Sequence, residues 1–237
     1  MSRKHWFLSD PHFGHGNIMK YCFRTEFMTD EERDLLAAKQ DFRVSKESVW
    51  RMNDAIIART NELVQPDDVL WILGDWCFAS GKFYYQDSRR CRDRLNVKTA
   101  HIVWGNHDSR KIADLFDSNH EQVMISINPH NGDYIVGEEE IGQQRKGRGW
   151  QKIVLNHYMM AIWNGSHKGN WHLYGHSHAG AEPWADSWMK GRRSLDVGVD
   201  NAKKLLGEYR PFSYDEISDH MAKQAGFSMD HHRERRR

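Results

Sequence analysis

Five polar clusters in this 237-residue chain contain the residue types that bind divalent metal ions. Each cluster follows a short apolar run, and the clusters are Ser9-Asp10-Pro11-His12, Gly74-Asp75, Gly105-Asn106-His107-Asp108, Asn156-His157 and Gly175-His176-Ser177-His178. Carboxylate, imidazole and amide oxygen are hard or borderline ligands, and a pair of ions about 3.5–4 Å apart is suited to attack on a phosphate ester. The residue types therefore indicate the chemistry of a two-metal phosphate hydrolysis site.

Each cluster taken alone also has an ordinary structural explanation. Asp10-Pro11 is a common turn, Asp75 follows a strand-end glycine, and a single His157 is typical of a hydrogen-bonded core histidine. The clusters around Asn106 and His176 are stronger, because several polar residues directly after a buried strand are costly unless they have partners. The occurrence of all five clusters, each at the end of an apolar run, favours one shared site.

The apolar runs predict strands that are buried on both faces. They cover residues 5–8, 69–73, 101–104, 153–155 and 171–174. Between the first two, apolar residues recur at helical spacing, with Ser45 or Ser48 able to cap the start and Pro66 after the end. This alternation predicts βαβ units early in the chain, whereas strands and turns follow from Gln122 on, with a turn at 129–133 and an exposed hairpin loop at 137–149.

The ordered set Asp-x-His, Gly-Asp, Gly-Asn-His-Asp, His and Gly-His-x-His resembles the calcineurin-like metallophosphoesterase superfamily. These motifs span residues 10–178. The segment from Phe13 to Ile18, together with the later run Leu195–Asp200, resembles a small bacterial and phage group within it. The resemblance implies a mixed α/β (α+β) fold, a four-layer αββα sandwich of the metallo-dependent phosphatase type. It would occupy one domain over residues 1–225, and residues 226–237 would form a basic C-terminal tail.

The resemblance also implies a role for each motif residue. Asp10, His12 and His178 would hold one metal, whereas Asn106, His157 and His176 would hold the other, and Asp75 would bridge both. His107 would contact the substrate phosphate or protonate the leaving oxygen, oriented by Asp108. A hydroxide bridging the metals would be the nucleophile.

The identity of the metals is narrowed by one departure from a known pattern. In purple acid phosphatases a Tyr three residues after the bridging Asp ligates ferric iron, and that position is Phe78 here. An iron–tyrosinate centre is therefore not expected. We expect two divalent ions, with Mn²⁺ as first choice and Fe²⁺, Ni²⁺, Co²⁺ or Zn²⁺ as alternatives.

Composition limits the setting in which such a site works. The net charge of +1 gives no strong attraction to nucleic acid or membrane, and no apolar run approaches the length of a membrane span. The three cysteines, Cys22, Cys77 and Cys91, have no CxxC spacing and predict a reducing compartment. We therefore expect a cytoplasmic hydrolase of a small phosphate ester, a phosphodiesterase or phosphatase acting on a nucleotide-like substrate. The alternatives are a nuclease, a protein phosphatase or a non-catalytic scaffold.

Several other residues have two open interpretations. His15 and Asn17 could line a substrate pocket, or be a surface histidine and a helix cap. The loop 163–171 could stack on a nucleotide through its tryptophans, or these could close the core. Arg110 and the pair Arg192-Arg193 could meet a phosphate or be solvated charges. The remaining histidines are expected to be structural or at the surface: His5, His101, His120, His130, His172 and His220.

Overall fold

The first of two mixed sheets has the strand order β10-β1-β2-β3-β4. Its strands are β10 (Phe212–Ser213), β1 (His5–Leu8), β2 (Val69–Ile72), β3 (Thr99–Val103) and β4 (Ser118–His120). β1 to β4 are parallel, with His5 opposite Val69 and Val69 opposite Thr99, and β10 joins β1 antiparallel. The computed structural model describes residues 2–78, 83–137, 140 and 149–226.

The second sheet has the order β6-β5-β7-β8-β9. Its strands are β6 (Tyr134–Val136), β5 (Gln122–Ile127), β7 (Gln151–Asn156), β8 (Trp171–Tyr174) and β9 (Ser194–Asp196). β5 pairs antiparallel with both β6 and β7, whereas β7, β8 and β9 run parallel.

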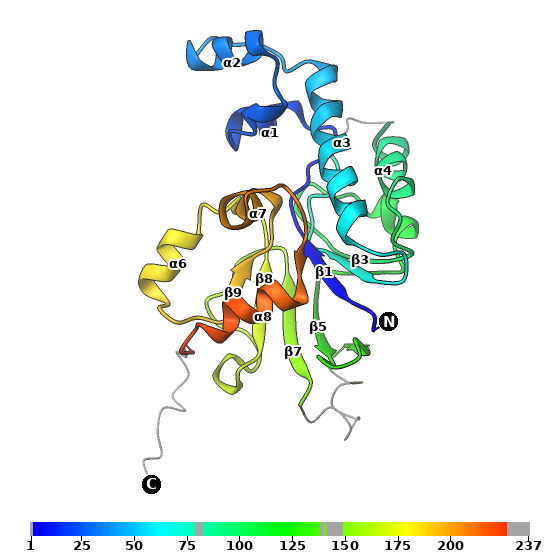
Figure 1. Cartoon of the computed structure of the whole chain (residues 1–237), viewed down its shortest axis with the longest axis vertical. Coiled ribbons are helices and arrows are strands. Elements are labelled where there is room, and N and C mark those ends of the chain that lie inside the picture. Colours follow the sequence, from blue (N-terminus) through cyan, green and yellow to red (C-terminus); the bar gives the residue numbers. More distant parts are fainter. Residues whose placement is uncertain (1, 79–82, 138–139, 141–148, 227–237) are drawn as a thin grey trace.

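Helices and short 3-10 turns connect the strands (Figure 1). The α-helices are α1 (Gly16–Tyr21), α2 (Asp30–Ala37), α3 (Lys46–Leu63), α4 (Tyr84–Asp93), α6 (Glu182–Trp188), α7 (Val199–Leu206) and α8 (Tyr214–Ala222). The 3-10 turns are η1 (Thr25–Phe27), η3 (Arg110–Leu115) and η4 (Ser166–Lys168). The longest helix, α3, begins after Ser45, whose side chain accepts a hydrogen bond from the Ser48 amide, and it ends before Pro66.

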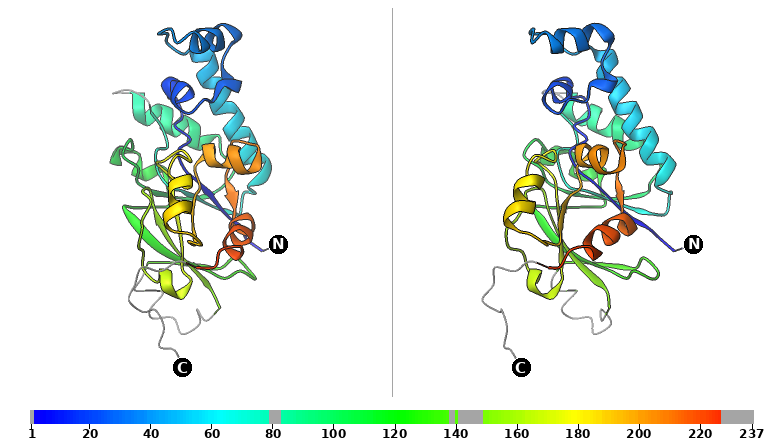
Figure 2. Two further views of the ribbon diagram at one scale, coloured as in Figure 1. Left: turned by 90° about the vertical axis from the view of Figure 1, so that its left-hand side faces the viewer. Right: turned by 60° about the vertical axis from the view of Figure 1, so that its left-hand side comes forward.

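The strand residues of the first sheet alternate between two apolar cores. Leu70 and Ile72 belong to a core shared with α3 and α4, whereas Val69 and Trp71 face a core shared with the second sheet. Both faces of these strands are therefore buried, which explains why they are apolar without interruption. Figure 2 shows α3 and α4 together on one side of the first sheet.

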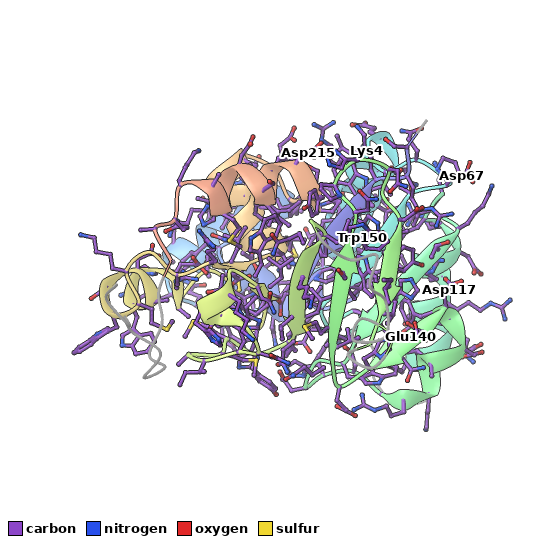
Figure 3. All side chains as sticks on the ribbon, turned by 90° about the horizontal axis from the view of Figure 1, so that it is seen from below. Lys4, Asp67, Asp117, Glu140, Trp150 and Asp215 are labelled. Atoms are coloured by element: carbon purple, nitrogen blue, oxygen red, sulfur yellow. The ribbon has the colours of Figure 1, made fainter. Side chains whose placement is uncertain are left out.

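The parallel strands of the first sheet have their amino ends on one side and their carboxyl ends on the other. Figure 3, which views the molecule from below, labels Lys4 and Asp67, which precede β1 and β2. The carboxyl ends of β1, β2 and β3 point the other way, because these strands are parallel. Loops that leave these ends are thereby brought together at one edge, which is where ligands bind in open α/β sheets.

The sequence-based expectations for the elements are largely confirmed. The five apolar runs are strands, β1-α3-β2 and β2-α4-β3 are parallel βαβ units, and a turn joins β5 to β6. The coarse class, a mixed α/β chain with two mixed sheets, is also confirmed. The expected hairpin at 137–149 and the tail at 226–237 lie almost wholly outside the described residues. Among the described helices, none combines the length and apolarity needed to cross a bilayer.

Candidate metal centre

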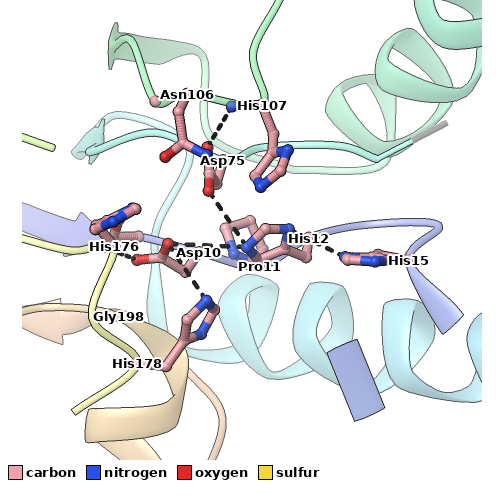
Figure 4. Close-up of polar contacts among 12 residues, drawn as sticks. Asp10, Pro11, His12, His15, Asp75, Asn106, His107, His176, His178 and Gly198 are labelled. Carbon is pink, nitrogen blue, oxygen red and sulfur yellow. Dashed lines mark hydrogen bonds and ion pairs between the residues drawn. The ribbon is translucent and has the colours of Figure 1, made fainter. Parts of the chain in front are cut away.

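The predicted ligands follow strand ends in both sheets and come together in space (Figure 4). Asp10 and His12 follow β1, Asp75 follows β2, and Asn106 follows β3. From the second sheet, His157 follows β7, and His176 and His178 follow β8.

Asp10, His12 and His178 form the first group. One ligand atom from each lies within 4.8 Å of the others. Asp10 Oδ1 is 3.9 Å from His12 Nε2 and 3.9 Å from His178 Nε2. The other carboxylate oxygen of Asp10 accepts a hydrogen bond from the His176 amide at 2.9 Å, which leaves Oδ1 directed at the two imidazoles.

Asp75, His157 and His176 form the second group, again with ligand atoms within 4.8 Å of one another. Asn106 adds an amide oxygen, because its Oδ1 lies 3.1 Å from His157 Nε2. These are the four residues expected at the second metal and the bridge. The sequence motifs and the geometry therefore divide the residues in the same way.

Asp75 lies between the two groups. Its Oδ2 is 3.4 Å from His12 Nε2 and 3.6 Å from His157 Nε2. Its Oδ1 accepts a hydrogen bond from the His107 amide at 2.9 Å, which fixes the carboxylate. A single oxygen that approaches one imidazole of each group is the arrangement that a bridging ligand requires.

Carboxylate oxygens and imidazole nitrogens converge in this centre. His157 Nδ1 faces the Leu73 carbonyl at 2.7 Å and must donate, so Nε2, which lies 3.6 Å from Asp75 Oδ2, is the ring atom available to a metal. Within the described part of the chain, the buried atoms Asp10 Oδ1 and His12 Nε2 have no hydrogen-bond partner. Buried acceptors left in this way are costly, and a bound cation would satisfy them.

The backbone at the ligands is strained. Among the described residues, eight non-glycine residues have positive φ, and five of them are predicted ligands. These five are Asp10 (55°), His12 (49°), Asp75 (53°), His176 (66°) and His178 (46°). Such conformations cost roughly 1–3 kcal/mol each and persist where the surrounding structure holds them, which is typical of functional sites.

Two glycines leave room for the ligands. A Cβ on Gly74, which has φ of +95°, would lie 2.5 Å from His157 Nδ1. A Cβ on Gly105 would lie 2.2 Å from Asp75 Oδ1. The glycines that the motifs contain are therefore needed for the close approach of the strand ends.

Burial sets the charge state of the first group. Burial raises the pKa of Asp10 above its usual value, although neighbouring histidines oppose this. Burial and the Arg24 charge lower the pKa of His12 far below its usual value, so its imidazole is neutral. The neutral His12 ring keeps a nitrogen lone pair beside the Asp10 carboxyl group, and metal ligands must be deprotonated in this way.

His178 is held by two residues, Asp200 and Arg24, for which the sequence motifs predicted no role. Its Nδ1 lies 2.6 Å from Asp200 Oδ2, and Arg24 binds the same carboxylate at 2.7 and 2.8 Å. Burial lowers the His178 pKa, but hydrogen bonds to Asp200 and Cys22 and nearby carboxylates outweigh it and raise the pKa to about 11. Asp200 ended a recognised motif without a role, and no local signal marked Arg24.

Asp108 does not have the role expected from the resemblance. Its carboxylate accepts hydrogen bonds from the backbone amides of Asp75 (2.8 Å), Trp76 (2.9 Å) and Gly105 (2.9 Å). None of its described hydrogen bonds reaches the His107 ring. Burial raises its pKa to about 6, against these amides, which lower it. Asp108 therefore ties the loops after β2 and β3 together and positions His107 only through the backbone.

His107 is exposed beside the centre. Its ring lies edge-on to His12, with centroids 5.5 Å apart, and to Phe78, with centroids 5.0 Å apart. His15 stacks on Phe78 with centroids 3.9 Å apart and approaches His12 with Nδ1 atoms 3.4 Å apart. His15 and Asn17 both line a pocket next to the centre, and Asn17 lies inside α1, not at its N-cap.

The other open alternatives are decided by burial and pairing. Trp163 and Trp171 are buried in core clusters, so they close the core and do not offer a stacking surface. Arg110 lies over Trp104 and pairs with Glu121, and Arg192 is buried against Glu182. Of the histidines outside the motifs, His5, His101 and His172 are buried, and His130 is exposed.

Comparison with known proteins gives a fold but no function. No family model matches the chain. It is similar to an uncharacterized protein of Methanocaldococcus jannaschii, with 30% identity over 132 residues, 54% of this chain. That match spans only 60% of the archaeal protein. The fold is similar to that of a protein of unknown function from Aquifex aeolicus, with a TM-score of 0.54 and 18% identity, covering 92% of this chain and 98% of the other.

Proposed function

We propose that this chain is a dinuclear metal-dependent phosphoesterase of the calcineurin-like type. The proposal rests on one observation: two groups of three ligands meet at Asp75, whose Oδ2 approaches one imidazole of each. The two mixed sheets, with their shared core and flanking helices, are consistent with the four-layer αββα sandwich of that superfamily, and we include this finer fold assignment in the proposal.

The residues present fit two divalent cations. Asp10, His12 and His178 would hold one, and Asn106, His157 and His176 the other, with Asp75 shared. Mixed nitrogen and oxygen donors suit Mn²⁺ first, with Fe²⁺, Ni²⁺, Co²⁺ or Zn²⁺ as alternatives. When bound, such ions supply Lewis acidity, lower the pKa of a coordinated water and neutralise phosphate oxygens.

Contact with the phosphate and protonation of the leaving oxygen are the proposed roles of His107. Its backbone amide is hydrogen-bonded to Asp75, so its ring stays beside the ligands while its side chain remains exposed. An imidazolium at this place can donate a hydrogen bond to a phosphate oxygen or a proton to the leaving oxygen. Proton donation matters most for alkoxide leaving groups, because an unprotonated alkoxide leaves slowly. His107 is therefore the proposed general acid.

The substrate that we propose is a small phosphate ester, of the nucleotide type. A scaffold without catalysis would have no use for an exposed His107 next to a complete set of ligands. In the part of the chain that the structure describes, each predicted ligand lies at the centre. We therefore favour an enzyme over a scaffold.

The test is hydrolysis by the Mn²⁺-loaded protein of bis-p-nitrophenyl phosphate and p-nitrophenyl phosphate, with the metal content measured on the same sample. Turnover that stops on chelation, with two metals per chain, is the expected result. The faster substrate assigns diester or monoester preference. Asp75→Asn should lose turnover and metal, whereas Asp219→Asn on the exposed part of α8 should keep both. Two bound metals without turnover of either ester would overturn the assignment as a general phosphoesterase.

A further inference from the structure

A pocket of about 510 Å³ opens next to the metal centre. Its lining comes from the loop after β1, from the segment leading into α3, and from α4. It meets the centre through His15, which lines the pocket and whose Nδ1 lies 3.4 Å from Nδ1 of the ligand His12. The volume lies within the range of about 300–1,000 Å³ that is common for small-molecule sites.

Aromatic side chains form a large part of the pocket wall. Trp50, Phe78 and Phe83 all line it, and Phe78 remains 41% exposed although it stacks on His15. Phe83 is also exposed, and aromatic rings that are open to solvent can stack on planar heterocycles. The wall therefore suits an aromatic, flat group in preference to a sugar or an alkyl chain.

The rim of the pocket carries positive charge. Arg43 and Lys46 line it, whereas Arg90, which does not line it, lies over the Trp50 ring at 4.1 Å from its centroid. Within the described chain, none of these three cations forms an ion pair with a carboxylate. Cations placed in this way attract phosphate, and arginine binds it in a bidentate manner.

The pocket also contains groups that can read the edge of a heterocycle. The Asn17 amide can both donate and accept, and the Asp87 carboxylate can accept from an exocyclic amine. The loop that leads from the metal ligands into the pocket is held in place, because the buried Asn53 side chain accepts a hydrogen bond from the Gly14 amide at 3.2 Å. The pocket is therefore tied to the centre by a fixed stretch of backbone.

We infer that this pocket binds the base of a nucleotide whose phosphate ester reaches the metal centre, with Arg43 and Lys46 pairing with a further phosphate. The inference rests on the proposed function for the reaction itself. Recognition of the base depends only on the pocket. Substrate selection would then take place on the α3–α4 side of the molecule and not at the loop 163–171.

The test is calorimetric titration of the full chain in the presence of a chelator, so that neither metal nor turnover contributes. The probes are 5′-AMP, ADP and ribose 5-phosphate. We expect AMP to bind about tenfold more tightly than ribose 5-phosphate, since base stacking supplies that difference. ADP should bind more tightly than AMP, and this advantage should shrink at high salt.

Substitutions in the pocket show which residues cause the two differences in affinity. Trp50→Leu should remove the advantage of AMP over ribose 5-phosphate, and Phe78→Leu, at a more exposed ring, should reduce it if Trp50→Leu does not fold. Arg43→Gln should remove the advantage of ADP over AMP. Trp188→Leu and Lys190→Gln, exposed positions in and after α6, serve as controls and should change neither.

Equal binding of AMP and ribose 5-phosphate by the wild type, or an unchanged difference in both aromatic variants, would overturn the inference. A single-stranded oligonucleotide that binds tenfold more tightly than ADP would also overturn it, in favour of a polymer. Because these measurements need no metal, nucleotide binding by a chain that fails to take up Mn²⁺ would refute the phosphoesterase and leave the pocket assignment standing.

Discussion

His178 and Asp200 form a 2.6 Å hydrogen bond through His178 Nδ1, and this bond directs His178 Nε2 toward Asp10. The buried Arg24 binds the same carboxylate and also donates to the backbone carbonyl oxygens of Asp10 and Pro11. Carboxylates that hold the far nitrogen of a metal-binding histidine fix its tautomer and orientation. Arg24 and Asp200 therefore hold His178 and the Asp10 loop in place, next to the proposed first metal group.

Replacement of Asp200 by Asn should weaken one metal site selectively. The side chain keeps its size, but it no longer fixes the His178 tautomer, so affinity for the first metal should fall about 10- to 100-fold. Binding to the group of His157 and His176 should be nearly unchanged. Titration with Mn²⁺ would resolve the two sites, and Asp219→Asn is the matched control. An equal loss at both sites would indicate a general disturbance of the fold.

Metal binding should stabilise the chain strongly. The converging lone pairs of Asp10, His12 and Asp75 cost free energy in the absence of a cation, and the cation binds only the folded arrangement. At a Mn²⁺ concentration 100 times Kd, the gain is about 2.7 kcal/mol for each site. Thermal unfolding followed with and without chelator should show a rise in Tm on adding Mn²⁺. This rise should be lost in Asp75→Asn, and its persistence there would argue against a shared ligand.

His107→Ala should separate catalysis from metal binding. The ring contributes no described ligand atom to either metal group, so metal content should be unchanged. Loss of a general acid costs about 10²–10⁴-fold in rate, and the loss should be largest for esters with alkoxide leaving groups. Rates on an alkyl and on a p-nitrophenyl ester give the comparison, with the exposed His130→Ala as control. A rate that is unaffected on both esters would remove His107 from the mechanism.

The sequence predicted which residues come together because their positions follow from one local rule. Asp10, Asp75 and Asn106 each lie within three residues of the end of a parallel strand, and parallel neighbours place their carboxyl ends at one edge. The same rule predicted the buried strands, since burial on both faces leaves an uninterrupted apolar run. Motif order and strand ends together were therefore sufficient for the centre.

Residues that hold the ligands in place from distant parts of the sequence could not be predicted by this rule. Arg24 and Asp200 are 176 residues apart, and a buried arginine has no local pattern that separates it from an exposed one. The hydrogen bonds of Asp108 were not predicted, because its amide partners belong to two loops that only the fold brings together. The sequence offered only His15 and Asn17 as possible lining of a pocket, because α3 and α4 provide further parts of its wall and only the fold brings these parts together.

Asp108→Ala should destabilise the chain without acting on the chemistry directly. It would leave three backbone amides without their acceptor, at Asp75, Trp76 and Gly105. Each unsatisfied buried donor costs roughly 1–3 kcal/mol, so a loss of at least about 3 kcal/mol is expected. Urea unfolding of the wild type, Asp108→Ala and the exposed control Asp219→Ala would measure it. A stable variant with a slow rate would instead restore the role in orienting His107.

Acid should destabilise the fold through His172, outside the metal centre. Its Nδ1 donates to the Val154 carbonyl and its Nε2 accepts from the Met160 amide, so the ring is held neutral. Burial lowers its pKa from 6.5 to about 4. Between pH 6.5 and pH 4, His172 is therefore protonated in the unfolded chain but stays neutral in the folded chain. The contribution is therefore complete above pH 6.5 and is lost as pH falls toward 4, by on the order of 3 kcal/mol.

Urea unfolding at pH 7.5 and pH 5, in chelator, would measure this loss. His172→Asn should be less stable at pH 7.5 but should show a smaller drop between the two pH values, because the titrating ring is gone. His130→Asn, at an exposed turn, should keep the wild-type drop. If His172→Asn showed the same drop in stability as the wild type, the acid sensitivity would have to arise at other buried histidines. His5 is one of these, since it is held neutral between the Gly132 carbonyl and the Trp71 indole.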